Sequence, residues 1–143
     1  MKRNLRPGGW AEFQDYDITV YSDDDPKQPE CETYKWAKTL IKLVESMGRE
    51  PAPGPKLEKW MRDAGFVNVK AKKIKLPIGP WAKDARLKEL GTCNLIQTLN
   101  GLEAFSLRIL CDVGKMSEEE VHVLLSQVRK EMKNPKMHQQ YDL

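Results

Sequence analysis

The stretch LRPGGWAEFQDY, residues 5–16, begins as a turn and continues as a strand. Pro7 fixes one torsion of the turn, and Gly8 and Gly9 accept the positive φ that tight turns need. From Trp10 to Tyr16 apolar and polar residues alternate, which is typical of a strand with two different faces. The stretch therefore predicts that the chain builds a sheet and that Trp10–Tyr16 is one of its strands.

A second strand is expected at Phe66–Ala71, where apolar residues again alternate with polar ones. Beyond it the apolar positions change parity, from Ala71 to Ile74. One inserted residue turns the buried face of a strand over, so this change predicts a bulge near Lys72 and Lys73.

Apolar residues at three- and four-residue spacing predict four or five helices between and after these strands. We expect them at Cys31–Met47, ended by Gly48; at Leu57–Ala64, ended by Gly65; from a cap at Asp84 to about Val113, with a break at Gly101; and after a capping box of Ser117 and Glu120. The acidic stretch Ser22–Pro29 is expected to be a solvated loop.

The order of these elements favours an α/β fold, because a helix between two strands is typical of a crossover connection. We expect one domain, residues 1–143, with a sheet-containing part at 1–76 and a helix-rich part at 77–143. Two or three strands with four or five helices make an incomplete sheet. We therefore expect oligomerisation or a partner chain to complete it.

Composition excludes several classes of protein. The chain has 143 residues, of which 40% are apolar and 31% charged, which is typical of one soluble domain. No apolar run approaches the roughly 18 residues of a membrane span, and no signal-peptide core follows Met1. The 3 cysteines fit neither a disulfide framework nor a metal knuckle. We expect a cytoplasmic or nuclear protein with no membrane partner.

Charge is distributed unevenly along the chain. Residues 1–30 carry 4 basic and 7 acidic side chains, whereas residues 56–91 carry 10 basic and 4 acidic ones. The acidic triplet Asp23–Asp25 lacks the alternating oxygen ligands of a calcium loop, so no metal site is expected. The lysines at 70, 72, 73 and 75 have no aromatic platform beside them, which favours a solvated strand edge over a nucleic-acid surface.

The turn and strand at residues 5–13 resemble those of class I S-adenosylmethionine-dependent methyltransferases, above all the fungal ones of secondary metabolism and its regulation. The stretch LPIGPW, residues 76–81, is the most specific part of the likeness. Further matches are Tyr34–Trp36, Gly48–Arg49, Pro55–Leu57, Ala64–Val69, Arg86–Glu89 and Glu118–Val121. The resemblance therefore covers nearly the whole chain.

The resemblance implies a partial Rossmann-like methyltransferase fold that corresponds to the C-terminal half of the family: the fifth strand, a helix, the sixth strand and added helices. The last strand of the family is expected to be absent, since the sequence stops at Leu143. The family holds its cofactor on a glycine-rich loop upstream of these elements, and this chain contains no G-x-G. We expect it to bind no cofactor alone, and S-adenosylmethionine only if a partner supplies the missing half.

The candidate site residues belong to the acceptor side of such a fold. Glu12 and Asp15 are candidate catalytic residues and Gln14 a substrate-binding one, since they follow the turn at a strand end that borders the ligand crevice of open α/β sheets. Trp81 and Asn94 are further substrate-binding candidates, for a small apolar or aromatic metabolite. Trp36 and Trp60 are expected in the core, since both lie on apolar helix stripes.

Other functions remain open from the sequence. Carboxylates beside a helical pocket also suit a cofactor-independent isomerase or cyclase that acts on a small apolar metabolite, and a non-catalytic regulatory partner or a fragment without a stable fold is a third reading. A nucleophilic triad is not expected, because His122 and His138 have no partner at a recognisable spacing. Cys93 has no basic neighbour to activate its thiol.

Overall fold

The fold was analysed on a computed structural model, which describes residues 5–24 and 30–143. Its elements in chain order are β1 (Asp17–Tyr21), α1 (Glu32–Ser46), the short 3-10 helix η3 (Gly54–Lys56), α2 (Leu57–Asp63), β2 (Lys75–Pro77), α3 (Ala85–Arg108), the π-helical turn η4 (Ile109–Val113), α4 (Glu118–Met132) and β3 (Gln140–Asp142). Helices and strands are both present, so the α/β class is confirmed.

The described strands form one antiparallel sheet in the order β1-β3-β2. β3 pairs with both neighbours: Gln140 lies opposite Tyr21 on one side and opposite Pro77 on the other. The expectation that no last strand follows the helices is therefore wrong. Residues 140–142, from the part of the chain expected to be helical, supply the central strand.

Both strands that the alternation pattern predicted are displaced along the chain. The structure begins β1 at Asp17, after the expected Trp10–Tyr16, and begins β2 at Lys75, after the expected Phe66–Ala71. Strand pairing occurs only where the short β3 lies alongside, which explains the displacement. The expected bulge near Lys72 and Lys73 is also wrong, since the irregular register lies in the β1–β3 pair.

The helix predictions hold more closely. Asp84 caps α3 by accepting a hydrogen bond from the Leu87 N–H at 2.9 Å. Ser117 and Glu120 form the expected capping box of α4, and Gly48 has the predicted left-handed φ of 72° after α1. The expected break at Gly101 is wrong, because α3 runs through it to Arg108.

The hydrophobic core lies between the helices and the sheet. α1 contacts β1 and α4, while α3 contacts β2 and α4. The side chains of Leu102, Leu110, Val121, Leu125 and Val128 are fully buried there. Trp36 is buried as expected, and its Nε1 donates to Ser106 Oγ at 2.8 Å. Trp60 is 44% exposed, so the expectation that it belongs to the core is wrong.

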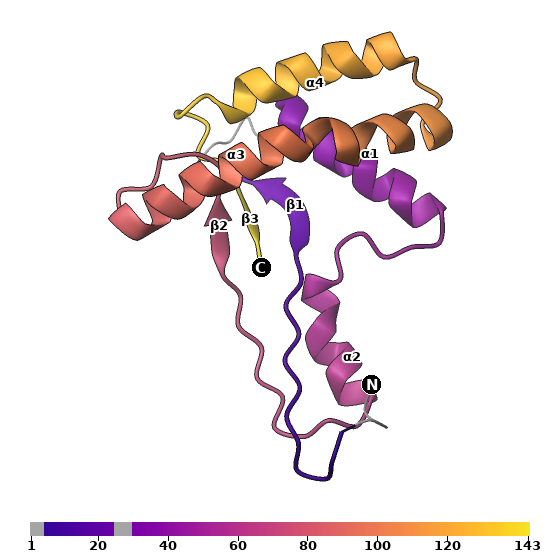
Figure 1. Ribbon diagram of the computed structural model, residues 1–143, viewed down its shortest axis with the longest axis vertical. Helices are drawn as coiled ribbons and strands as arrows, with labels where there is room; N and C mark the ends of the chain where they lie inside the picture. The colour runs from indigo at the N-terminus through magenta and orange to yellow at the C-terminus, as the bar shows by residue number, and fades with distance from the viewer. Residues whose placement is uncertain (1–4, 25–29) are drawn as a thin grey trace.

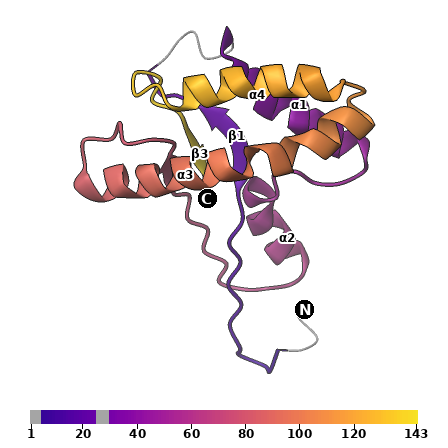
Figure 2. The same ribbon diagram turned by 45° about the horizontal axis from the view of Figure 1, so that its top comes forward.

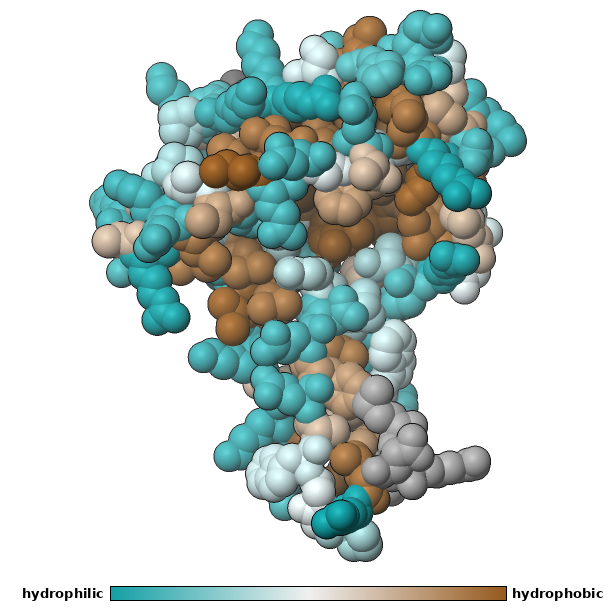
Figure 3. Space-filling view, viewed as in Figure 1, coloured by the Kyte–Doolittle hydropathy of each residue, from teal (hydrophilic) through white to brown (hydrophobic). Residues whose placement is uncertain are grey.

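A second region, here called the arm, comprises residues 5–16 and 51–74 and includes α2. Figures 1 and 2 show it extending away from the helices, with residues 10–16 and the segment that leads to β2 running as extended chain. None of its residues is buried. In the space-filling view it forms the narrow lower lobe, and hydrophobic residues lie open on its surface (Figure 3).

Candidate functional site

Three of the predicted site residues lie in the arm. Glu12 and Gln14 are exposed and contact each other, with Gln14 Nε2 donating to Glu12 Oε1 at 3.0 Å. Asp15 Oδ1 accepts from the Tyr16 backbone N–H at 2.9 Å. All three precede β1 and therefore lie at its amino end, whereas ligands of open α/β sheets bind beyond the carboxyl ends of strands. They therefore lie away from the edge where such ligands bind, and their roles in catalysis and substrate binding stay predictions.

Asn94 connects α3 to the sheet. It is buried, its Nδ2 donates to the Pro77 carbonyl at 2.7 Å, and its Oδ1 accepts from the Tyr141 hydroxyl at 2.6 Å. Burial raises the pKa of that Tyr141 hydroxyl, which keeps it protonated as a donor. The Asn94 amide is thus engaged with β2 and β3, which explains why a polar residue lies inside this helix–sheet contact.

Trp81 is half-buried in the loop after β2, where its Nε1 donates to the Gln139 carbonyl at 3.0 Å. Its indole stacks on the ring of His138, with centroids 5.0 Å apart and an interplanar angle of 29°. His138 Nδ1 lies 2.6 Å from Asp24 Oδ2. Trp81, His138 and Asp24 therefore form one cluster, here called the edge cluster.

The structure brings the edge cluster to the carboxyl ends of β1 and β2. Because Gln140 pairs with both Tyr21 and Pro77, the residues just after these two strands meet the residues just before β3. Sequence reasoning missed His138 as a site residue. The 114 positions that separate it from Asp24 leave no local spacing by which a pattern could pair them.

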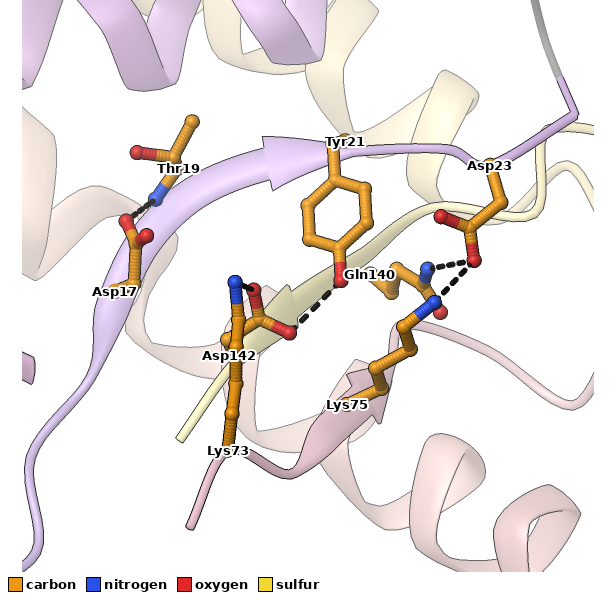
Figure 4. A network of polar contacts seen from close by, with 8 residues as sticks. All are labelled: Asp17, Thr19, Tyr21, Asp23, Lys73, Lys75, Gln140 and Asp142. Carbon is orange, nitrogen blue, oxygen red and sulfur yellow. Dashed lines mark hydrogen bonds and ion pairs between the residues drawn. The ribbon is translucent and has the colours of Figure 1, made fainter. Parts of the chain in front are cut away.

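A second polar network lies on the sheet, where Tyr21, Lys73 and Asp142 converge (Figure 4). The carboxylate of Asp142 is buried; it accepts from the Tyr21 hydroxyl at 2.8 Å and lies 2.6 Å from Lys73 Nζ. Burial raises the pKa of Tyr21, and the hydrogen bond to Asp142 adds to the rise. The same carboxylate raises the pKa of Lys73. These contacts satisfy a charge inside the sheet and keep β3 in place.

The loop after β1 is joined to the other two strands. Asp23 Oδ2 lies 2.7 Å from Lys75 Nζ and accepts from Gln140 Nε2 at 2.8 Å, and the Lys75 contact lowers the pKa of this carboxyl (Figure 4). Asp24 has a lowered pKa because of His138. Asp25, the third residue of the acidic triplet, lies outside the described residues. Asp23 and Asp24 are exposed, which agrees with the predicted solvated loop. Their contacts with other segments nevertheless hold the described part of the loop in place.

The described residues do not fit S-adenosylmethionine. The chain has no G-x-G loop, and the carboxyl edge of its sheet presents Asp23 and Asp24 rather than backbone N–H groups for the cofactor carboxylate. The Gly8–Gly9 turn closes on itself, since Gly9 N–H donates to the Arg6 carbonyl at 2.9 Å. Within the described ranges, no three His, Cys, Asp or Glu side chains are grouped to hold a metal ion.

A hollow on the outer side of α4 is lined by Met116, Glu119, Glu120, Val123, Leu124 and Gln127. None of the predicted site residues lines it. Among the residues that the structure describes, no helix combines the length and the apolar character that crossing a membrane requires.

Comparison with known proteins finds relatives that align with almost the whole chain. Methyltransferase pytC of Aspergillus terreus is 37% identical over 139 residues, which cover 97% of this chain and 43% of that protein. The probable methyltransferase tdiE of Emericella nidulans is 34% identical and also covered to 43%, with 94% of this chain aligned. The secondary metabolism regulator LAE1 of Cochliobolus heterostrophus is 27% identical, with 94% of this chain and 45% of that protein aligned.

No family model and no solved structure matches the chain. The relatives are nonetheless consistent in kind: they are fungal methyltransferases and regulators of secondary metabolism, as the resemblance of residues 5–13 and 76–81 implied. The chain spans somewhat less than half the length of these relatives. It is a homologue of the fungal methyltransferases of secondary metabolism.

Proposed function

We propose that this chain is the acceptor-side half of a small-molecule methyltransferase and that it acts when paired with a cofactor-binding half, carried by another chain or supplied in a dimer of this one. The similarity to methyltransferases over 97% of the chain supports the reaction class. S-adenosylmethionine would be bound by the paired assembly, since the described residues of this chain do not fit it. The acceptor would be a small apolar or aromatic metabolite.

One observation carries the pairing: β1 is an edge strand. β3 pairs one side of β1, and no strand of the described residues pairs the other. Before β1, no backbone hydrogen bond joins residues 10–15 to another described segment. Trp10, at the start of this stretch, is 86% exposed. A long extended edge with an open tryptophan is a template for a further strand.

The opposite edge of the sheet is protected. The segment that leads into β2 carries Lys70, Lys72 and Lys73, and all three are exposed. Lysines on an edge oppose the addition of another strand, because pairing would remove their charges from water. The β1 edge is therefore the one we assign to the partner.

Calorimetry with S-adenosylmethionine tests this function. The cofactor is titrated into the chain alone and into a mixture with a separately produced chain comprising the part of pytC that this chain does not match. We expect no binding heat from the chain alone and saturable binding from the mixture. Light scattering reports the mass of each sample, and a dimer that binds the cofactor by itself would support the self-paired form.

Two proline variants locate the paired edge. Phe13→Pro removes a backbone N–H from the β1 side and should abolish complex formation. Ala71→Pro, at an exposed position on the lysine side, should preserve it. Cofactor binding by a monomer of this chain would overturn the proposal. So would a mixture in which neither a complex nor a dimer forms.

A further inference from the structure

The edge cluster has the features of a ligand site rather than of a loop contact alone. Its three residues come from three segments: Asp24 follows β1, Trp81 follows β2 and His138 precedes β3. They meet beyond the carboxyl ends of two mutually parallel strands, which is where open α/β sheets bind ligands. The side chain of His138 remains 37% exposed there.

The imidazole of His138 is held from two sides. Asp24 Oδ2 lies 2.6 Å from Nδ1 and fixes the proton on that nitrogen when the ring is neutral. Trp81 fixes the plane of the ring by stacking at 5.0 Å, and is itself held by the Gln139 carbonyl. A histidine whose one nitrogen is bound to a carboxylate presents the other nitrogen as an acceptor.

The backbone of His138 has a strained conformation. Its φ is 43°, in the left-handed region that residues with a side chain seldom adopt. Strained backbone of this kind is held by the surrounding structure and is concentrated at functional sites. Here the contact with Asp24 and the stack on Trp81 hold the side chain.

Two acceptor atoms of this segment have no hydrogen-bond partner among the described residues. One is His138 Nε2. The other is Oε1 of the next residue, Gln139, which is only 5% exposed. The Gln139 atom is enclosed, whereas the His138 side chain is 37% exposed, so His138 is the residue that a ligand with a hydrogen-bond donor can reach.

We propose that the edge cluster binds a hydroxyl-bearing aromatic ligand and that His138 Nε2 accepts its proton. The O–H bond of the ligand breaks, an Nε2–H bond forms, and the resulting imidazolium is stabilised by the carboxylate of Asp24, while the ligand oxygen keeps the electron pair. That this ligand is the methyl acceptor rests on the proposed function. The binding itself requires only the described residues.

NMR of the chain labelled with ¹⁵N-histidine tests the proposal, with phenol and anisole as matched probes. Anisole has the same ring but no hydroxyl proton. The protein has 2 histidines. His122, which lies on α4 and contacts Glu103 of α3 and Glu118 of α4, is the internal reference. We expect the neutral His138 ring to carry its proton on Nδ1, beside Asp24, and its Nε2 signal to shift with phenol alone.

Variants assign that response. His138→Gln and Asp24→Ala should abolish the phenol-induced shift, and His122→Gln should leave it intact. A His138 ring protonated at Nε2, an equal response to anisole, or no response to phenol would each overturn the proposal, and these readings on the wild-type chain need no variant to fold. Because no cofactor enters the experiment, its failure is separate from a failure of cofactor binding in the paired assembly.

Discussion

The helix–sheet region and the arm of this molecule use their apolar residues in opposite ways. In the first, Leu102, Leu125 and Val128 are fully buried between α1, α3, α4 and the sheet. In the second, Trp10 is 86% exposed and Val67 is 83% exposed. Figure 3 shows the resulting contrast between a broad body and a narrow lobe with open hydrophobic surface.

The helix–sheet region is stabilised by contacts within this chain, whereas the arm presents apolar surface that another chain could bind. Burial of side chains such as Leu125 contributes most of the free energy of folding. None of the residues of the arm is buried, so its contribution is smaller. Apolar surface that lies open is available to a partner when it forms a contiguous patch. The arm is also where the sheet edge of β1 continues, which is why we assign pairing to it.

The largest expected effect comes from truncating a core side chain and comparing it with a truncation in the arm. Leu125→Ala should lower the free energy of unfolding by about 2–5 kcal/mol, because it removes buried methyl groups and leaves a cavity. Val67→Ala, in the arm, should change it by less than about 0.5 kcal/mol, because the Val67 side chain is 83% exposed. Urea unfolding measures both. Similar losses for the two variants would contradict the division of the molecule into these regions.

A smaller loss is expected where α3 meets the loop after β2. A Cβ added at Gly91 would lie 2.2 Å from the Gly79 carbonyl oxygen, so Gly91→Ala should cost about 1–3 kcal/mol by forcing two backbones apart. Gly101→Ala is the control in the same helix. There the added atom meets only the exposed ring of Phe105, which can rotate, and a gain of up to about 1 kcal/mol in helix propensity is expected. Equal destabilisation of both variants would show that helix geometry, not close contact, sets the cost.

The helices were predictable from the sequence because their signals are local. Asp84 and Ser117 cap helices through atoms three residues away, and the left-handed Gly48 lies directly after α1. The strands were not, because their pairing depends on β3. Residues 140–142 read Gln-Tyr-Asp, too short and polar for a strand pattern, yet they determine which parts of the earlier alternating stretches form ladders.

The dependence of the strands on β3 also explains which candidate site residues the structure brings together. Glu12, Gln14 and Asp15 were selected by their place in an expected strand, so the displacement of β1 moved them away from its carboxyl end. Asn94 and Trp81 were selected within local segments and do lie beside β2 and β3. Their own roles in substrate binding stay predictions. The contact of His138 with Asp24 arises only from the tertiary fold.

The smallest effect is expected where the arm is fastened to the body. Lys73, near the end of the arm, and Tyr21, in β1, both contact the buried carboxylate of Asp142. Tyr21→Phe removes one hydrogen bond and should cost about 0.5–1.5 kcal/mol at neutral pH. It should also change the response to alkali, because the folded chain raises the pKa of Tyr21 above the ordinary value of 10.0.

Above about pH 10 the unfolded chain releases the Tyr21 proton while the folded chain keeps it, so stability is complete below that pH and falls as the pH rises. Tyr141, whose pKa is also raised by burial, acts in the same direction. Urea unfolding from about pH 8 to 11 should therefore show a weaker alkaline loss for Tyr21→Phe than for the wild type. The remaining loss is due to Tyr141, Lys73 and the other groups whose pKa the fold raises. If both proteins lose stability equally, the hydroxyl of Tyr21 does not donate to Asp142 in solution.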